Sequence, residues 1–227
     1  MIWTIISAII VFSFGLWFGN KKTLHLDQIT LRVCLVFSTI LLTLFLLLRL
    51  LNDIGLFPEA IAGAFMASIY ALVAGFLIGN SYGQYNSKLE LGVIEYLNRS
   101  FAADTLPNLI ALTLIIAGIA RTSIFNDLAI TPIRFASGLS IVGLGFLGLT
   151  LRLTPEFRRK GIVLIDRHVL WKDFISYKWC DENVLEIEFL YSDVLTSYRT
   201  VIPMEERVRI EALLKKKLIE KLEKESD

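Results

Sequence analysis

The chain has 227 residues, of which 55% are hydrophobic and 20% are charged, and its formal net charge is +1. This composition excludes a disordered chain, a polybasic nucleic-acid-binding protein and a small domain held together by disulfides. The charges are unevenly placed, because residues 1–151 hold 8 basic and 7 acidic residues whereas residues 152–227 hold 15 of each. We therefore expect a membrane-embedded half followed by a water-soluble half.

Five apolar stretches dominate the first half. A helix that crosses the roughly 30 Å core of a bilayer needs about 20 apolar residues. The stretches that meet or approach this length are residues 2–19, 31–51, 60–79, 107–125 and 135–151. Because so little polar sequence separates them, they predict an α-helical membrane bundle of five transmembrane helices over residues 1–151. The first stretch has its basic residues after it and no small-residue cleavage motif, so we expect a retained helix.

The Lys and Arg residues of the short loops predict how these helices are oriented. With the N-terminus outside, nine basic residues fall on the cytoplasmic side: Lys21, Lys22, Arg32, Lys88, Arg99, Arg152, Arg158, Arg159 and Lys160. Three fall on the opposite side: Arg49, Arg121 and Arg134. We therefore expect a protein of the cell inner membrane, or of an internal membrane, with its C-terminus in the cytoplasm. A four-span alternative, with residues 107–120 re-entrant, would put the third loop or the C-terminal half on the wrong side.

Small residues recur at every fourth position of the third apolar stretch. They are Gly63, Ala67, Ala71, Gly75 and Gly79. This spacing keeps them on one face of a helix, and small side chains let helices approach closely in lipid. We predict a helix-packing seam there, formed either with a neighbouring helix or with a second subunit. The scarcity of ionisable residues within the apolar stretches argues against an ion-coupled transporter.

The segment after the third stretch is predicted to leave the bilayer through the turn-like sequence SYGQYNS. Apolar residues then recur at helical spacing, at Leu91, Ile94, Leu97 and Phe101. The pattern predicts a short helix at about residues 88–101. Two placements stay open for this helix, namely in the membrane interface or docked on the soluble half.

A proline-marked linker opens the second half. It carries a membrane-proximal basic cluster, which consists of Arg152, Arg158, Arg159 and Lys160. Such a cluster follows the positive-inside pattern and is compatible with contact to anionic lipid. We expect it to anchor the end of the last span.

From Gly161 onward the hydrophobic period changes to that of strands. The predicted strands are residues 161–166, 168–171, 174–180, 184–192 and 195–202. Pro203 then begins an amphipathic helix. The second half is therefore predicted to be a small α+β domain, an antiparallel sheet capped by a C-terminal helix. Four aromatic residues are expected in its core, Trp171, Phe174, Tyr177 and Trp179.

This order of sheet and helix resembles a known kind of module. The resemblance lies in Gly161-Ile162, in the run from Val169 to Ile175 and in the helix that ends near Leu218. Over roughly residues 157–220, the chain is similar to bacterial PH-like domains of unknown function, which are often attached to several membrane spans. The resemblance implies a cytoplasmic PH-like domain at residues 157–227 that binds or assembles and does not catalyse.

The sequence offers no constellation for catalysis or for metal binding. His25 and His168 lie in different halves, and no metal-spaced Cys/His set, phosphate-cradling Gly loop or Ser-His-Asp order is present. Cys34 and Cys180 also lie in different halves, so we expect no disulfide between them. We therefore predict no enzyme activity, no cofactor and no metal.

The predicted function is that of a membrane scaffold or regulator whose cytoplasmic module binds protein partners or lipid. The alternative is a small transporter or channel component that is gated by its soluble module. The expected partners are the lipid bilayer and a protein or second copy, bound through the third span or the soluble domain. No nucleic-acid partner is expected, since the net charge is only +1.

Overall fold

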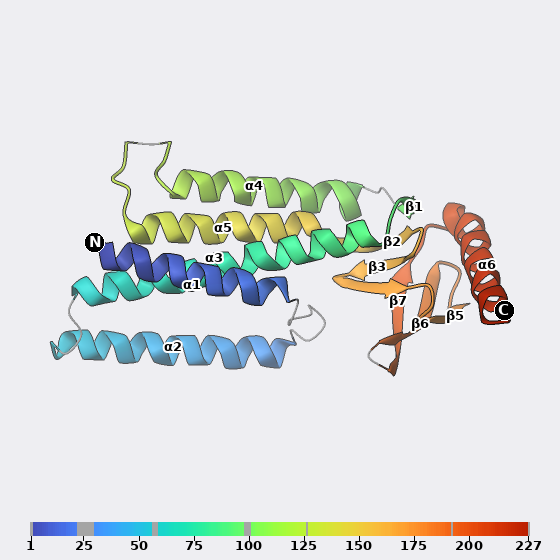
Figure 1. The fold of residues 1–227 in the computed structure, drawn as a ribbon, viewed down its shortest axis with the longest axis horizontal. Coiled ribbons are helices and arrows are strands. Elements are labelled where there is room, and N and C mark those ends of the chain that lie inside the picture. Colours follow the sequence, from blue (N-terminus) through green and yellow to red (C-terminus); the bar gives the residue numbers. More distant parts are fainter. Residues whose placement is uncertain are drawn as a thin grey trace. The chain divides into compact units, whose positions relative to one another are not determined.

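The computed structural model describes residues 2–21, 30–55, 59–97, 101–125, 127–191 and 193–226 (Figure 1). The chain forms two compact units. The helical unit comprises Met1–Gln84 and Asn108–Thr150, and the C-terminal unit comprises Tyr85–Pro107 and Leu151–Asp227. The C-terminal unit is therefore built from two separate pieces of the sequence, and its first piece was assigned to the membrane half by the sequence pattern.

The N-terminal half is helical, as predicted. Its helices are α1 (Ile2–Asn20), α2 (Leu31–Asp53), α3 (Glu59–Glu90), α4 (Leu106–Arg121) and α5 (Pro132–Thr150). A short π-helical turn, η2 (Phe101–Thr105), leads into α4. Within the described residues, four segments are long and apolar enough to cross a membrane: Ile2–Asn20, Ile61–Glu90, Phe101–Arg121 and Pro132–Thr150. Helix α2 forms where the second stretch was predicted, and several of its side chains lie outside the described residues.

Helix α3 is longer than its apolar stretch. It continues through the sequence SYGQYNS, which was predicted to be turn-like and is helical instead. The helix predicted at residues 88–101 is also wrong, because α3 ends at Glu90 and a strand, β1 (Ile94–Leu97), follows it. Gly92 separates the two elements with a φ of +80°, a conformation that glycine adopts at little cost. Residues 98–100 lie outside the described residues.

Glycines let α1 and α3 meet backbone to backbone. A methyl group at Gly75 would overlap the carbonyl oxygen of Phe12, and one at Gly79 would overlap that of Leu16. In the opposite direction, methyl groups at Gly15 and Gly19 would overlap carbonyl oxygens of α3. Gly75 and Gly79 of the predicted seam therefore pack against α1, a neighbouring helix of the same chain.

The other seam positions lie nearer the start of α3. Ala67 and Ala71 are buried, and the heavy atom nearest to a methyl group at Gly63 would be Ile133 Cδ1 of α5, at 3.9 Å. Helix α5 also contacts α3 through Ser140, whose Oγ donates a hydrogen bond to the Tyr70 carbonyl oxygen at 2.7 Å. The seam is thus divided between contacts to α1 and α5.

Within the described residues, the C-terminal unit contains seven antiparallel strands and the helix α6, together with the end of α3 and η2. The strands after β1 are β2 (Arg152–Arg158), β3 (Gly161–Ile165), β4 (Arg167–Leu170), β5 (Phe174–Trp179), β6 (Val184–Tyr191) and β7 (Val194–Val201). They form a four-stranded sheet in the order β1-β2-β3-β4 and a three-stranded sheet in the order β5-β6-β7. The last helix is α6 (Met204–Ser226). The antiparallel strands and final helix were predicted, but as one sheet.

Two strands of the first sheet were not predicted. Residues 152–158, expected as a linker, form β2, and the loop between α3 and α4 supplies β1. The register between β2 and β3 shifts between Arg152 and Glu156, which brackets Pro155. Proline has no backbone N–H to donate to a neighbouring strand, so it is tolerated at such an irregularity. Its presence in the sequence argued against a strand here.

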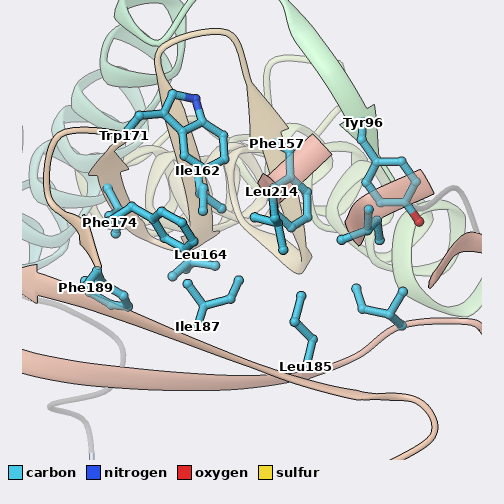
Figure 2. Close-up of a cluster of buried hydrophobic side chains, with 13 residues drawn as sticks. Tyr96, Phe157, Ile162, Leu164, Trp171, Phe174, Leu185, Ile187, Phe189 and Leu214 are labelled. Carbon is cyan, nitrogen blue, oxygen red and sulfur yellow. The ribbon is translucent and has the colours of Figure 1, made fainter. Parts of the chain in front are cut away.

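The core of the C-terminal unit lies between the two sheets and α6 (Figure 2). Phe157, Ile162 and Leu164 come from the first sheet, and Leu185, Ile187 and Phe189 come from the second. Ile210 and Leu214 of α6 complete it, so the helix closes the space between the sheets. Trp171 and Phe174 belong to this core and Tyr177 and Trp179 pack against it, as predicted.

Candidate ligand cleft and helix-end ion network

A cleft of about 680 Å³ opens on the surface of the C-terminal unit. Its walls come from β1, from the β2–β3 turn, from the β4–β5 turn and from α6. The lining residues are Glu95, Arg159, Lys160, Leu170, Trp171, Lys172, Lys216, Lys217, Glu220 and Lys221. Six of these side chains are cationic and two are acidic, so the cleft has a formal charge of +4 in a chain whose net charge is +1.

Lys217 is the buried cation of the cleft, with 7% of its side chain exposed. Its Nζ lies 3.1 Å from Glu95 Oε1 and 3.7 Å from Glu220 Oε2. It also donates to the carbonyl oxygen of Arg159 at 3.4 Å. Lys217 therefore joins α6 to β1 and to the β2–β3 turn, and it engages both carboxylates of the cleft.

Four exposed cations form the rim of the cleft: Arg159, Lys160, Lys172 and Lys216. Lys221 is half-buried and donates to the Phe174 carbonyl oxygen at 2.8 Å. Within the described residues, no hydrogen bond or ion pair joins the side chains of Arg159, Lys160 or Lys172 to an acidic group. Lys216 lies 3.9 Å from Glu220, at the limit of an ion pair. Because both carboxylates already face Lys217, the positive charges of Arg159, Lys160 and Lys172 are left uncompensated within the cleft.

An apolar wall adjoins these cations. Trp171 is 9% exposed, and its Nε1 donates to the carbonyl oxygen of Arg158 at 2.9 Å. Its ring packs edge-on against Phe174, with 5.6 Å between centroids, and Lys217 Nζ lies 5.8 Å from the Trp171 centroid. The indole is thus held in one orientation, and Leu170 extends the apolar surface.

Beside the cleft lies a second polar feature, the helix-end ion network, which comprises Lys88, Asp104, Arg152, Glu156 and Arg158. Glu156 is 1% exposed, and its Oε1 accepts hydrogen bonds from Arg158 Nη2 at 2.6 Å and Nε at 3.0 Å. Arg152 forms an ion pair with Asp104, and its Nε lies 3.9 Å from Glu156 Oε2. A buried carboxylate is therefore matched by two guanidinium groups.

The same Arg158 caps α3. Its Nη1 donates to the carbonyl oxygen of Lys88 at 2.7 Å and to that of Gly92 at 2.8 Å. The last carbonyls of a helix lack partners within the helix and carry partial negative charge, so a guanidinium satisfies both needs. All residues of the network belong to the C-terminal unit.

Backbone hydrogen bonds connect the rim of the cleft to the end of α3. The N–H of Lys160 donates to the Leu91 carbonyl oxygen at 3.0 Å, and the N–H of Arg159 donates to that of Val93 at 2.9 Å. Arg158, which caps α3, directly precedes these two residues. The β2–β3 turn therefore belongs to both the cleft and the helix-end ion network.

The predicted basic cluster is divided between these two features. Arg152 and Arg158 are engaged in ion pairs within the C-terminal unit, whereas Arg159 and Lys160 form one rim of the cleft. Sequence reasoning missed Glu156 and the cations of α6 and of the β4–β5 turn. The run Lys215–Lys217 was visible, but only the fold brings two of its residues to the same cleft as Arg159. Within the part of the chain that the structure describes, no cluster of His, Cys, Asp and Glu could hold a metal.

The comparisons with known proteins match only the C-terminal half. Residues 153–219 match the family described as "Domain of unknown function (DUF5673)". No curated protein and no solved structure matches the chain. The matched segment runs from β2 into α6 and omits β1, so the family's boundaries leave out a strand that this unit contains. The C-terminal region of this chain therefore carries a DUF5673 domain.

Proposed function

We propose that this chain is an integral membrane scaffold or regulator whose C-terminal domain binds a protein partner or lipid and transmits binding to the ends of its membrane helices. The observation that carries this proposal is the helix-end ion network. Lys88 lies in the last turn of α3, Asp104 lies in η2 two residues before the start of α4, and Arg152 lies two residues after the end of α5. One buried carboxylate, Glu156, therefore organises charges beside three helix ends.

The proposed topology has five spans, with α2 as the second, an external N-terminus and a cytoplasmic C-terminus. The loop cations support this topology by nine to three. Strand β1 adds support, because it pairs with β2 and a membrane cannot separate two paired strands. The loop between α3 and α4 then lies on the same side as the C-terminal domain. Helices α4 and α5 would cross the membrane as a pair.

The proposed nature of the domain is PH-like, as in bacterial membrane proteins, with a binding role and no catalytic one. Its four-stranded and three-stranded antiparallel sheets and the helix that closes them support a PH-like architecture. The basic cleft supports binding. Ligand at Arg159 and Lys160 would act on a turn that is hydrogen-bonded to the end of α3.

The topology is tested by thiol labelling of the full chain in intact and permeabilised cells. With Cys34→Ala, the exposed Cys180 is the single thiol. We expect a membrane-impermeant maleimide to label it only after permeabilisation. Single thiols from Val93→Cys and Asp127→Cys, made with Cys34→Ala and Cys180→Ser, should be labelled from the cytoplasm and from outside respectively. Labelling of the Val93 and Cys180 positions from opposite sides would refute the proposed arrangement.

The transmission step is tested by hydrogen exchange of the full chain in nanodiscs. We expect Arg158→Gln to increase amide exchange in the last turn of α3 and in η2, because it removes the cap of α3 and a partner of Glu156. Arg199→Gln is the matched control, since Arg199 pairs with Glu186 on the other sheet. Equal exchange in the wild type and Arg158→Gln would show that the network does not act on the helix ends.

A second candidate function is a small transporter or channel component gated by the C-terminal domain. It is favoured by two buried amides on α3, Asn80 at 7% and Gln84 at 2% exposure. Within the described residues, Asn80 Oδ1 and Gln84 Oε1 accept no hydrogen bond, which is costly for a buried polar group. Ion or solute flux into proteoliposomes that is abolished by Asn80→Leu, but not by Ser13→Ala on α1, would favour this candidate.

A further inference from the structure

We infer that the basic cleft binds a phosphate group, carried either by a lipid headgroup or by a soluble phosphate ester. The inference rests on the proposed function in one respect, that the C-terminal domain is a binding module, and it names the ligand class. It does not depend on the number of membrane spans or on the transmission to the helices.

The charge of the cleft favours a multiply charged anion. Its formal charge is +4, its two carboxylates face Lys217, and within the described residues no acidic group pairs with Arg159, Lys160 or Lys172. A phosphate monoester carries about −1.5 to −2 charges near neutral pH, so one or two phosphate groups match this excess. A single carboxylate would leave most of the charge unbalanced.

The placement of the cations suits a tetrahedral anion. Arg159 and Lys160 lie on the β2–β3 turn, Lys172 lies on the β4–β5 turn, and the remaining lysines lie on α6. Lysine ammonium groups act as point charges with several donors, and convergent lysines bind phosphate without the planar geometry that favours carboxylate. The cations therefore approach the opening from three elements.

The cleft also has room for the organic part of the ligand. Its volume of about 680 Å³ falls within the range of small-molecule sites. Leu170 and the fixed ring of Trp171 provide an apolar wall beside the charges. A phosphate ester or a headgroup presents this combination of anionic and apolar surface.

The test measures pyrophosphate binding by calorimetry to the full chain in nanodiscs of neutral phosphatidylcholine. The cleft variant is Lys160→Gln with Lys172→Gln. The matched control is Lys178→Gln with Lys215→Gln, which removes the same charge from lysines outside the cleft that pair with Glu186 and Glu211. We expect the cleft variant to bind roughly tenfold more weakly and the control to bind as the wild type does.

A second arm identifies the source of the phosphate. The wild type, the cleft variant and the control variant are placed in nanodiscs that contain phosphatidylcholine and phosphatidic acid. Native mass spectrometry then counts the phosphatidic acid molecules that each protein retains. Cleft-dependent retention assigns a lipid headgroup, and cleft-dependent pyrophosphate binding without it assigns a soluble ester. The inference is overturned if neither ligand binds, if both variants weaken binding equally, or if only a polyglutamate peptide binds in the cleft. None of these results bears on the thiol-labelling test of topology.

Discussion

The guanidinium of Arg158 donates a hydrogen bond of 2.7 Å to the backbone carbonyl of Lys88, which lies 70 residues earlier in the chain. The same side chain holds the buried carboxylate of Glu156. Arg158 therefore completes the end of helix α3 and the polar interior of the C-terminal unit at once. This double role makes it the residue whose loss should affect the unit most selectively.

Arg158→Gln is expected to destabilise the C-terminal unit by about 3–5 kcal/mol, because it leaves the Glu156 carboxylate buried without its closest cation. Thermal unfolding of the full chain in detergent measures the change. Arg209→Gln removes an exposed cation 3.8 Å from Glu206, and should cost less than about 1 kcal/mol. The double variant with Glu156→Gln should recover part of the loss. If Arg158→Gln were as stable as Arg209→Gln, the ion pair between Arg158 and Glu156 would not stabilise the unit.

Tyr96 on β1 should be needed for the DUF5673 domain to fold, although it lies outside the matched residues. Its side chain is 3% exposed and its ring lies 5.8 Å from that of Phe157. Replacement by alanine is expected to cost about 3–5 kcal/mol, as for other large core aromatics. Tyr96→Phe is the matched control, because within the described residues the hydroxyl has no hydrogen-bond partner. The measurement is the resistance of β2–β4 to proteolysis in the full chain, which should fall in Tyr96→Ala and not in Tyr96→Phe. Equal resistance in the two variants would show that the domain folds without the Tyr96 ring.

Gly79→Ala should separate α1 from α3. The added methyl group would overlap the Leu16 carbonyl oxygen, so the helices must move apart at a cost of about 1–3 kcal/mol. At Gly63, where the nearest heavy atom is 3.9 Å away, the same substitution should not destabilise the protein, because alanine is favoured over glycine inside a helix by about 0.5–1 kcal/mol. Fluorescence-detected thermostability of the full chain in detergent compares them. If both variants unfold at the wild-type temperature, the α1–α3 contact is not close.

Stability should depend on the ionisation of Glu186 below pH 4.5. A hydrogen bond from the Cys180 thiol, followed by those from Lys178 and Arg199, lowers the pKa of Glu186 from 4.5 to about 2. Since the folded pKa lies below the unfolded one, this stabilisation is fully present above pH 4.5 and is lost as the pH falls toward about 2. Glu186→Gln should remove that part of the pH dependence. Thermal scans at pH 5 and pH 3 measure it, and an identical loss in both proteins would contradict the assignment.

Local sequence was sufficient for most of the individual elements. The apolar stretches predict α1, α2, α4 and α5 because a helix in lipid must satisfy its own backbone and present apolar side chains. The alternation after Gly161 predicts β3 to β7, and Pro203 marks the start of α6. Each of these signals lies within a few residues of the element that it predicts.

The strands whose partners are far away in the sequence could be recognised only from the tertiary structure. The apolar residues of β1 have helical spacing in the sequence. They form a strand because β1 pairs antiparallel with β2, with Tyr96 opposite Phe157. Strand β2 contains a proline and is held between β1 and β3. Pairing of this kind depends on residues about sixty positions apart, which a local period does not report.

The polar sites show the same division. Hydrophobic period and charge are local properties, so the order of residues predicts two halves, a helical half with few charges and a densely charged half of strands and a helix. The order of residues does not show which charges act together. Folding buries Arg158 against Glu156 and Lys88, and leaves Arg159 facing a cleft whose other wall is α6. Whether a cation stabilises the fold or remains for a ligand depends on its distance to carboxylates, and only the tertiary structure sets that distance.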